Sequence, residues 1–119
     1  MARLIWTEES VRWLGAIFDY IAVENPAAAR RVVKEIYEKV DVLKIFGGIG
    51  YRYDVGDEEK EVRILLYGHY RIAYRVKKDA VEILGVFHGA MDIKKYLSIE
   101  GRMMGKSSKK KFTFSVKEK

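Results

Sequence analysis

The spacing of apolar residues predicts a strand and a helix at the start of the chain. A short apolar run predicts a strand over residues 2–6. Apolar residues then recur three and four positions apart, which is typical of one face of an amphipathic helix. This stripe predicts a helix over residues 8–24, with Val11, Leu14, Ile17, Phe18 and Ile21 on its apolar face. Thr7 is a favourable N-cap, and the glutamates that follow it place negative charge in the first turn.

A second helix begins at Asn25-Pro26, because asparagine is a good N-cap and proline suits the first helical position. Its apolar positions are Ala29, Val32, Val33, Ile36, Val40 and Leu43. The pattern predicts that this helix runs to about Phe46 and ends at Gly47-Gly48. Almost no linker separates the two helices, so we expect a tight antiparallel hairpin.

The second half of the chain alternates in the manner of strands. Strands are predicted over residues 62–67, 70–76 and 81–87, after a loop or frayed hairpin at residues 47–61. Gly68-His69 joins the first two as a type II′ turn. Alternation places residues 70, 72, 74 and 76 on one face and residues 71, 73 and 75 on the other, and it groups residues 81, 83, 85 and 87.

The order of these elements predicts an α+β fold. It reads β-α-α-β-β-β, an antiparallel sheet with an N-terminal helical hairpin packed on one face. Asp92 can cap a last short helix that ends near Gly101. We therefore expect one domain over residues 1–101 and a separate basic tail over residues 102–119.

The positive charge of the chain is confined to that tail. Lysine and arginine number 23 against 17 acidic residues, a net charge of +6. Residues 1–101 contain 16 of each sign, whereas residues 102–119 contain seven basic residues and one acid. The tail predicts either a basic arm that contacts phosphates or, through the alternating residues 112–116, a strand added to a sheet edge.

Composition removes several classes of function. The chain has no cysteine, which excludes disulfides, thiolate metal sites and thiol nucleophiles, and its two histidines leave little room for a metal site. We expect no cofactor and no metal. The apolar runs are far shorter than the ~20 residues that span a bilayer, and no leader pattern opens the chain. The sequence therefore predicts a cytoplasmic protein that does not contact a membrane.

Five segments, in this order, resemble the RelE/ParE superfamily of small toxins, many of them called plasmid stabilisation proteins. They are residues 6–7, 20–22, 25–29, 70–76 and 81–89, and the resemblance covers residues 4–97. It implies the toxin of a type II toxin–antitoxin module, bound by a cognate antitoxin and contacting operator DNA only through it. A homodimer is compatible with this family.

The superfamily holds two activities. RelE-like members cleave mRNA in the ribosomal A site without a metal, and ParE-like members inhibit DNA gyrase. The long helical hairpin with its Asn25-Pro26 junction resembles the ParE branch, which favours gyrase over a ribosome-dependent endonuclease. A toxin fold without toxicity, kept as a partner of its antitoxin, is a third hypothesis.

Cations and titratable groups supply the candidate site. Metal-free RNA cleavage needs an acid, a base and cations for the charge that develops on phosphorus. In the RelE-like interpretation these groups are Arg63, Arg71, His88 and Tyr96. For target binding they are Arg52, Arg63, Arg71 and Arg75, with the arginines of the strands expected on the sheet face away from the helices. The alternative is structural: surface arginines, a strand-end histidine and a packing tyrosine.

One position departs from the family pattern. The segment after the last predicted strand is His-Gly-x-Arg-Asp in related toxins, and here Met91 replaces the arginine. Methionine cannot replace arginine as a bidentate ligand of phosphate or carboxylate. This departure counts against a nuclease and makes an inactivated toxin conceivable.

Overall fold

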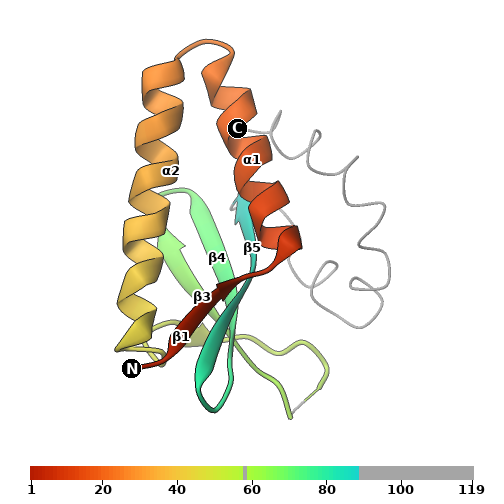
Figure 1. The fold of residues 1–119 in the computed structure, drawn as a ribbon. Coiled ribbons are helices and arrows are strands. Elements are labelled where there is room, and N and C mark those ends of the chain that lie inside the picture. The colour runs from red at the N-terminus through yellow and green to blue at the C-terminus, as the bar shows by residue number, and fades with distance from the viewer. Residues whose placement is uncertain (58, 89–119) are drawn as a thin grey trace.

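The computed structural model describes residues 1–57 and 59–88, and within them two α-helices, a short 3-10 helix and a five-stranded sheet are present (Figure 1). The elements are β1 (Arg3–Trp6), α1 (Glu8–Ala22), α2 (Pro26–Asp41), the 3-10 helix η1 (Val42–Lys44), β2 (Tyr51–Arg52), β3 (Glu61–Tyr67), β4 (Tyr70–Val76) and β5 (Ala80–His88). This is the predicted α+β fold. The helix predicted from Asp92 and the tail over residues 102–119 lie outside the described residues.

Both helices begin at the predicted caps. The Thr7 hydroxyl accepts a hydrogen bond from the Ser10 N–H at 3.1 Å and donates to the Ile83 carbonyl at 2.7 Å, which ties the start of α1 to β5. The Asn25 side chain accepts from the Ala28 N–H at 3.0 Å. Satisfied N–H groups at both N-termini explain why these two boundaries follow from local sequence.

The C-terminal end of α2 differs from the prediction. The α-helix stops at Asp41 and continues as η1, rather than running to about Phe46. The Lys44 carbonyl accepts a hydrogen bond from the Ala2 N–H at 3.0 Å, so the start of β1 satisfies a group that a longer helix would bond internally. A contact between residues far apart in the sequence thus accompanies the earlier end of the helix.

The sheet has the strand order β1-β5-β4-β3-β2 and is mixed. Strands β3 to β5 pair antiparallel as predicted. The two-residue β2 lies in the segment predicted as a loop or frayed hairpin and pairs antiparallel with β3. The prediction of an antiparallel sheet is wrong for β1, which pairs parallel with the first half of β5. A two-residue turn joins β3 to β4, with Gly68 at a φ of +56°, and no described residue other than glycine has a positive φ. Positive φ at only the first turn position fits the predicted type II′ turn.

A β-bulge in β5 changes which of its side chains share a face. Ala73 of β4 pairs with Gly85 and the next residue, Tyr74, pairs with Ile83, which leaves Leu84 without a partner in β4. The prediction that residues 81, 83, 85 and 87 share a face is therefore wrong. One extra residue in β5 reverses the alternation, so the last two of these positions lie on the other face.

The buried side chains form one hydrophobic cluster with members on both faces of the sheet, and Figure 1 shows α1 beside β5. Its largest fully buried side chains are Trp13, Tyr74, Phe87, Ile36, Leu43, Ile64, Ile72, Ile83, Val40, Val81 and Val86. The Trp6 ring of β1 lies 4.6 Å from the Tyr37 ring of α2, and the Tyr67 hydroxyl of β3 donates to Glu35 of α2. We call the sheet face that carries Trp6 and Tyr67 the α2 face.

Candidate functional site

Arg63 holds the segment that connects η1 to β2. Its Nη1 donates to the carbonyl oxygens of Gly48 at 3.1 Å and Gly50 at 2.6 Å, and its Nε donates to the Glu61 carboxylate at 2.7 Å. Only 19% of the side chain is exposed. Two carbonyls and a carboxylate account for much of the hydrogen-bonding capacity of this guanidinium, so the structure gives Arg63 a positioning role.

Tyr74 holds the same segment from within the core. Its hydroxyl donates to the Gly47 carbonyl and accepts from the Gly50 N–H, both at 2.8 Å, and burial raises the pKa of the phenol. A Cβ at Gly50 would lie 2.6 Å from the Ile64 carbonyl oxygen and 2.7 Å from the Tyr74 hydroxyl. The approach is closer than any side chain allows, which explains the glycine.

The clamped segment presents apolar side chains to solvent. We call residues 45–51 the glycine loop. Its large exposed side chains are Ile45 at 65%, Phe46 at 58%, Ile49 at 55% and Tyr51 at 46%. The sequence pattern does not reveal this surface, because it predicts a helix up to about Phe46 and a loop or frayed hairpin over residues 47–61. One signal in the sequence is Ile49, an apolar residue that lies between two glycines in a segment with no predicted buried face.

Arg71 and Arg75 lie on the face opposite to Arg63. Arg63 pairs in register with Tyr74, whereas Arg71 and Arg75 alternate with it on β4. The expectation that all the strand arginines share the face away from the helices is therefore wrong for Arg63. The register of β3 against β4 places it on the α2 face, with Tyr67 four residues further along the same strand.

The ion pairs of Arg75 also limit it as a site residue. Its Nη1 lies 3.9 Å from one oxygen of Glu82, and the Nζ of Lys77 lies 3.2 Å from the other. Arg71 is partly buried, with its Nε inside the protein. Arg52 is exposed on β2 at the end of the glycine loop.

His88 ends β5 at the other end of the α2 face. Its ring lies 6.2 Å from that of Tyr70 and 6.3 Å from that of His69. Burial raises the pKa of Tyr70 to about 12, so this phenol is neutral at physiological pH. His88 pairs with Tyr70 of β4, and Arg63 pairs with Tyr74, four residues further along that strand. Four residues of a strand span about 13 Å, which is the separation of His88 from Arg63 along the strand direction.

The RelE-like candidates are thus dispersed over the described residues. Arg63 and His88 lie at different ends of one face, and Arg71 lies on the other. Tyr96 and Met91 lie outside the described residues. Within residues 1–57 and 59–88, no group of three or more histidine and acidic side chains is arranged to hold a metal ion, and no helix is long and apolar enough to cross a membrane.

Comparison with known proteins places this geometry in a family. Residues 4–93 match the model of the ParE toxin of type II toxin–antitoxin system, parDE. Y4kP of Sinorhizobium fredii (strain NBRC 101917 / NGR234), whose name describes it as a toxin, is 38% identical over 88 residues, which are 72% of this chain and 86% of Y4kP. A solved structure described as the chromosomal ParDE TA system from P. aeruginosa has a TM-score of 0.61 at 26% identity, over 74% of this chain and 96% of that one. The chain belongs to the ParE family of type II toxin–antitoxin toxins.

Proposed function

We propose that this protein arrests growth by binding and inhibiting DNA gyrase, and that a cognate antitoxin neutralises it. Membership of the ParE family supports the gyrase target over mRNA. The similar structure from P. aeruginosa is described as a ParDE toxin–antitoxin system, which supports an antitoxin as the partner of this chain too.

The observation that carries the proposal is the dispersal of the catalytic candidates. A metal-free nuclease needs its acid, base and cations around one phosphate, within hydrogen-bond reach of the reacting atoms. Arg63 is engaged by the glycine loop, and it is separated from His88 along the sheet and from Arg71 by the sheet itself. Inhibition by binding needs a presented surface instead.

The glycine loop and Arg52 form that surface in our proposal. The loop combines exposed apolar side chains with a backbone fixed by Tyr74 and Arg63, so its surface is already ordered before a target binds. Arg52 adds an exposed cation beside it. Phe46 would supply apolar contact, and Arg52 an ion pair or hydrogen bonds to a carboxylate.

Two assays run side by side test the target. Purified toxin is added to a gyrase supercoiling reaction and to a cell-free translation reaction whose mRNA is mapped for A-site cleavage. We expect loss of supercoiling and intact mRNA. Cleaved mRNA with normal supercoiling would instead establish the endonuclease hypothesis, and harmless overexpression without antitoxin, with neither effect, would establish a toxin fold without toxicity.

A matched pair of arginine variants tests the surface. Arg52→Ala should weaken gyrase inhibition about tenfold, the effect of losing ~1.4 kcal/mol of binding free energy. Arg30→Ala removes an equally charged, exposed side chain from α2 and should change inhibition less than twofold. Circular dichroism of both variants checks the fold. Equal inhibition by the two variants would remove Arg52 from the proposed surface.

A further inference from the structure

Two arginines lie opposite each other at the β2 edge of the sheet. Arg52 of β2 pairs in register with Arg63 of β3. The N–H of Tyr53 donates to the Val62 carbonyl at 2.9 Å, so the neighbouring arginine pair is of the non-hydrogen-bonded kind, in which side chains lie closest. Both arginines therefore project from the same face, with their Cβ atoms about 4.5–5.5 Å apart. Like charges in this position repel each other and destabilise the sheet.

Arg63 has two N–H groups that hold nothing in the described part of the chain. Its Nε donates to Glu61, and its Nη1 donates to the carbonyls of Gly48 and Gly50. Nη2 carries the other two of the five guanidinium donors and has no acceptor among the described residues. It is not buried, so it can be reached from solvent. The three hydrogen bonds fix the plane of the guanidinium and thereby the direction of the Nη2 donors.

Arg52 is exposed and has no acidic partner within residues 1–57 and 59–88. The next acid along the chain, Asp54, accepts a hydrogen bond from the Gly56 N–H at 2.8 Å. Arg52, Arg63 and Glu61 together carry two positive charges and one negative charge. One further anionic group would therefore balance the cluster and relieve the repulsion between the arginines.

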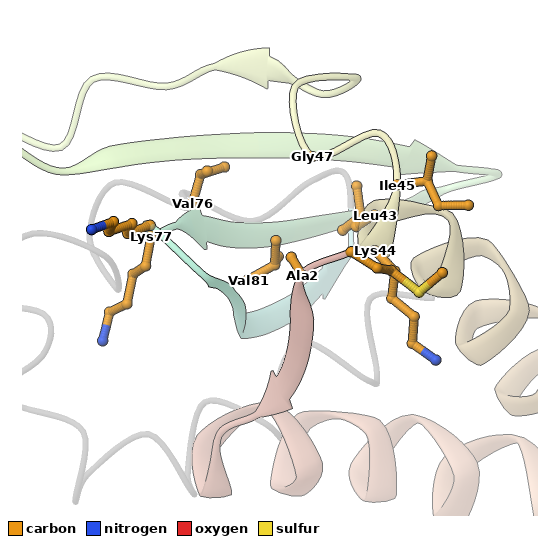
Figure 2. Close-up of a pocket in the computed structure, with 10 residues that line it drawn as sticks. Ala2, Leu43, Lys44, Ile45, Gly47, Val76, Lys77 and Val81 are labelled. Atoms are coloured by element: carbon orange, nitrogen blue, oxygen red, sulfur yellow. The ribbon is translucent and has the colours of Figure 1, made fainter.

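The lysine-lined pocket next to Gly47 does not offer the same combination (Figure 2). Its volume is about 440 Å³, and Figure 2 shows Lys44 and Lys77 at its two ends. Lys44 lies 2.8 Å from Asp41 and Lys77 lies 3.2 Å from Glu82, so both ammonium groups already have a carboxylate. The arginine pair is therefore the stronger candidate for binding an anion.

We propose that Arg52 and the Nη2 of Arg63 together bind one carboxylate of gyrase, from an aspartate or glutamate beside an apolar patch. The two oxygens of a carboxylate can each accept a charge-assisted hydrogen bond, one from either arginine. The exposed apolar side chains of the glycine loop directly precede Arg52, so the partner surface should place apolar residues next to this acid.

A carboxylate suits this site better than a nucleic-acid phosphate. Residues 1–101 contain 16 basic and 16 acidic residues, whereas proteins that bind nucleic acid through its backbone present a broad positive surface. Two arginines beside apolar side chains are typical of a protein partner instead. The identity of the partner rests on the gyrase target in the proposed function, and the anion site rests on the arginine geometry alone.

The test places a carboxylate in the site. Arg52→Glu removes one donor and sets its own carboxylate opposite Arg63, where it would take the position of the gyrase acid. Arg52→Gln removes the same donor without adding a charge. Arg30→Glu, at an exposed position of α2, makes the same charge reversal away from the site. Circular dichroism checks that the full-length variants fold.

Binding to purified gyrase without DNA is measured by titration calorimetry. Arg52→Gln should raise the dissociation constant about tenfold, and Arg52→Glu about a hundredfold or more, because it also occupies Arg63. Arg30→Glu should stay within about threefold of the wild type. Equal dissociation constants for Arg52→Glu and Arg30→Glu would overturn the role of this site in gyrase binding.

Urea unfolding of the isolated toxin tests the geometry independently of gyrase. The midpoint of Arg52→Glu should exceed that of Arg52→Gln, because only the carboxylate can form an ion pair with Arg63. The difference should shrink as sodium chloride is raised from about 0.05 M to about 0.5 M. Equal midpoints at low salt would show that a carboxylate at position 52 does not reach Arg63, and would overturn the anion site.

Two further outcomes separate this inference from the proposed function. If wild-type toxin does not bind gyrase, the proposed target fails, and the urea comparison still decides the anion site. If a DNA duplex alone binds the wild type and Arg52→Glu abolishes that binding, the site takes a phosphate, which would overturn the assignment to a protein carboxylate.

Discussion

Removing one oxygen atom from the core should release the glycine loop. Tyr74→Phe keeps the ring, which is fully buried, and deletes the hydroxyl that bonds both Gly47 and Gly50. The Gly50 N–H is buried and would lose its partner, whereas Gly47 is half-buried, so we expect water to replace the hydroxyl at its carbonyl. The Gly50 N–H should therefore account for more of the lost stability than the Gly47 carbonyl.

The size of the effect follows from this difference. A buried donor left without a partner costs about 1–3 kcal/mol, and a hydrogen bond that water can replace contributes about 0.5–1.5 kcal/mol. Together they predict a fall of about 2–4 kcal/mol in the free energy of unfolding. With a urea m-value of about 2 kcal/mol per M, the unfolding midpoint should fall by about 1–2 M with m unchanged.

Amide hydrogen exchange locates the change. The Gly50 amide should be protected in the wild type and exchange much faster in Tyr74→Phe, while amides in β4 and β5 follow only the global loss of stability. Tyr20→Phe, which alters a tyrosine on α1 that is 38% exposed, is the control and should shift the free energy of unfolding by less than about 0.5 kcal/mol. If Tyr74→Phe were as stable as that control, with unchanged exchange at Gly50, the Tyr74 hydroxyl would not hold the glycine loop.

Three further variants test other contacts. Gly50→Ala should cost about 1–3 kcal/mol or more because its Cβ meets backbone and the buried phenol, whereas Gly48→Ala has open space and should be near neutral in the same urea titration. Thr7→Ala should lower the free energy of unfolding by about 1–2 kcal/mol, because the helix cap is lost. Thr7→Ser keeps the hydroxyl and should lose less than half of that amount. Thermal unfolding would contradict this if Thr7→Ser were the less stable of the two variants. The folded protein keeps the Tyr70 proton up to about pH 12, whereas the unfolded chain releases it near pH 10. The free energy of unfolding should therefore fall as the pH rises through this interval. Urea titrations at pH 9 and pH 11.5 should show a smaller fall in Tyr70→Phe than in the wild type.

Local signals account for the parts of the fold that the sequence predicted well. The caps at Thr7 and Asn25 and the turn at Gly68 depend on residues within three or four positions of one another. The positions of the helix starts and of the β3–β4 turn can therefore be predicted from local sequence. The same is true of the helical hairpin, whose apolar stripes are continuous in the sequence.

The features that the sequence did not predict depend on distant partners. The bulge at Leu84 is visible only against the register of β4, and the parallel pairing of β1 only once β5 is placed. Arg63 has the charge of a ligand-binding residue, and only carbonyl groups 13 and 15 residues earlier in the chain show that it holds a loop. Residue type therefore identified Arg63 as a candidate, whereas its hydrogen bonds to the glycine loop follow only from the fold.

The parallel pairing of β1 with β5 has a consequence for synthesis. Arg3 is placed opposite Ala80, so the first strand emerges 77 residues before its partner exists. At ~5–20 residues per second, a ribosome needs about 4–15 s to close that gap. During this interval β1 has no strand to pair with, and the Thr7 hydroxyl lacks the Ile83 carbonyl to which it donates a hydrogen bond in the folded protein. A nascent chain that is interrupted before β5 cannot complete the sheet. The folded toxin therefore cannot form until the ribosome has synthesised β5.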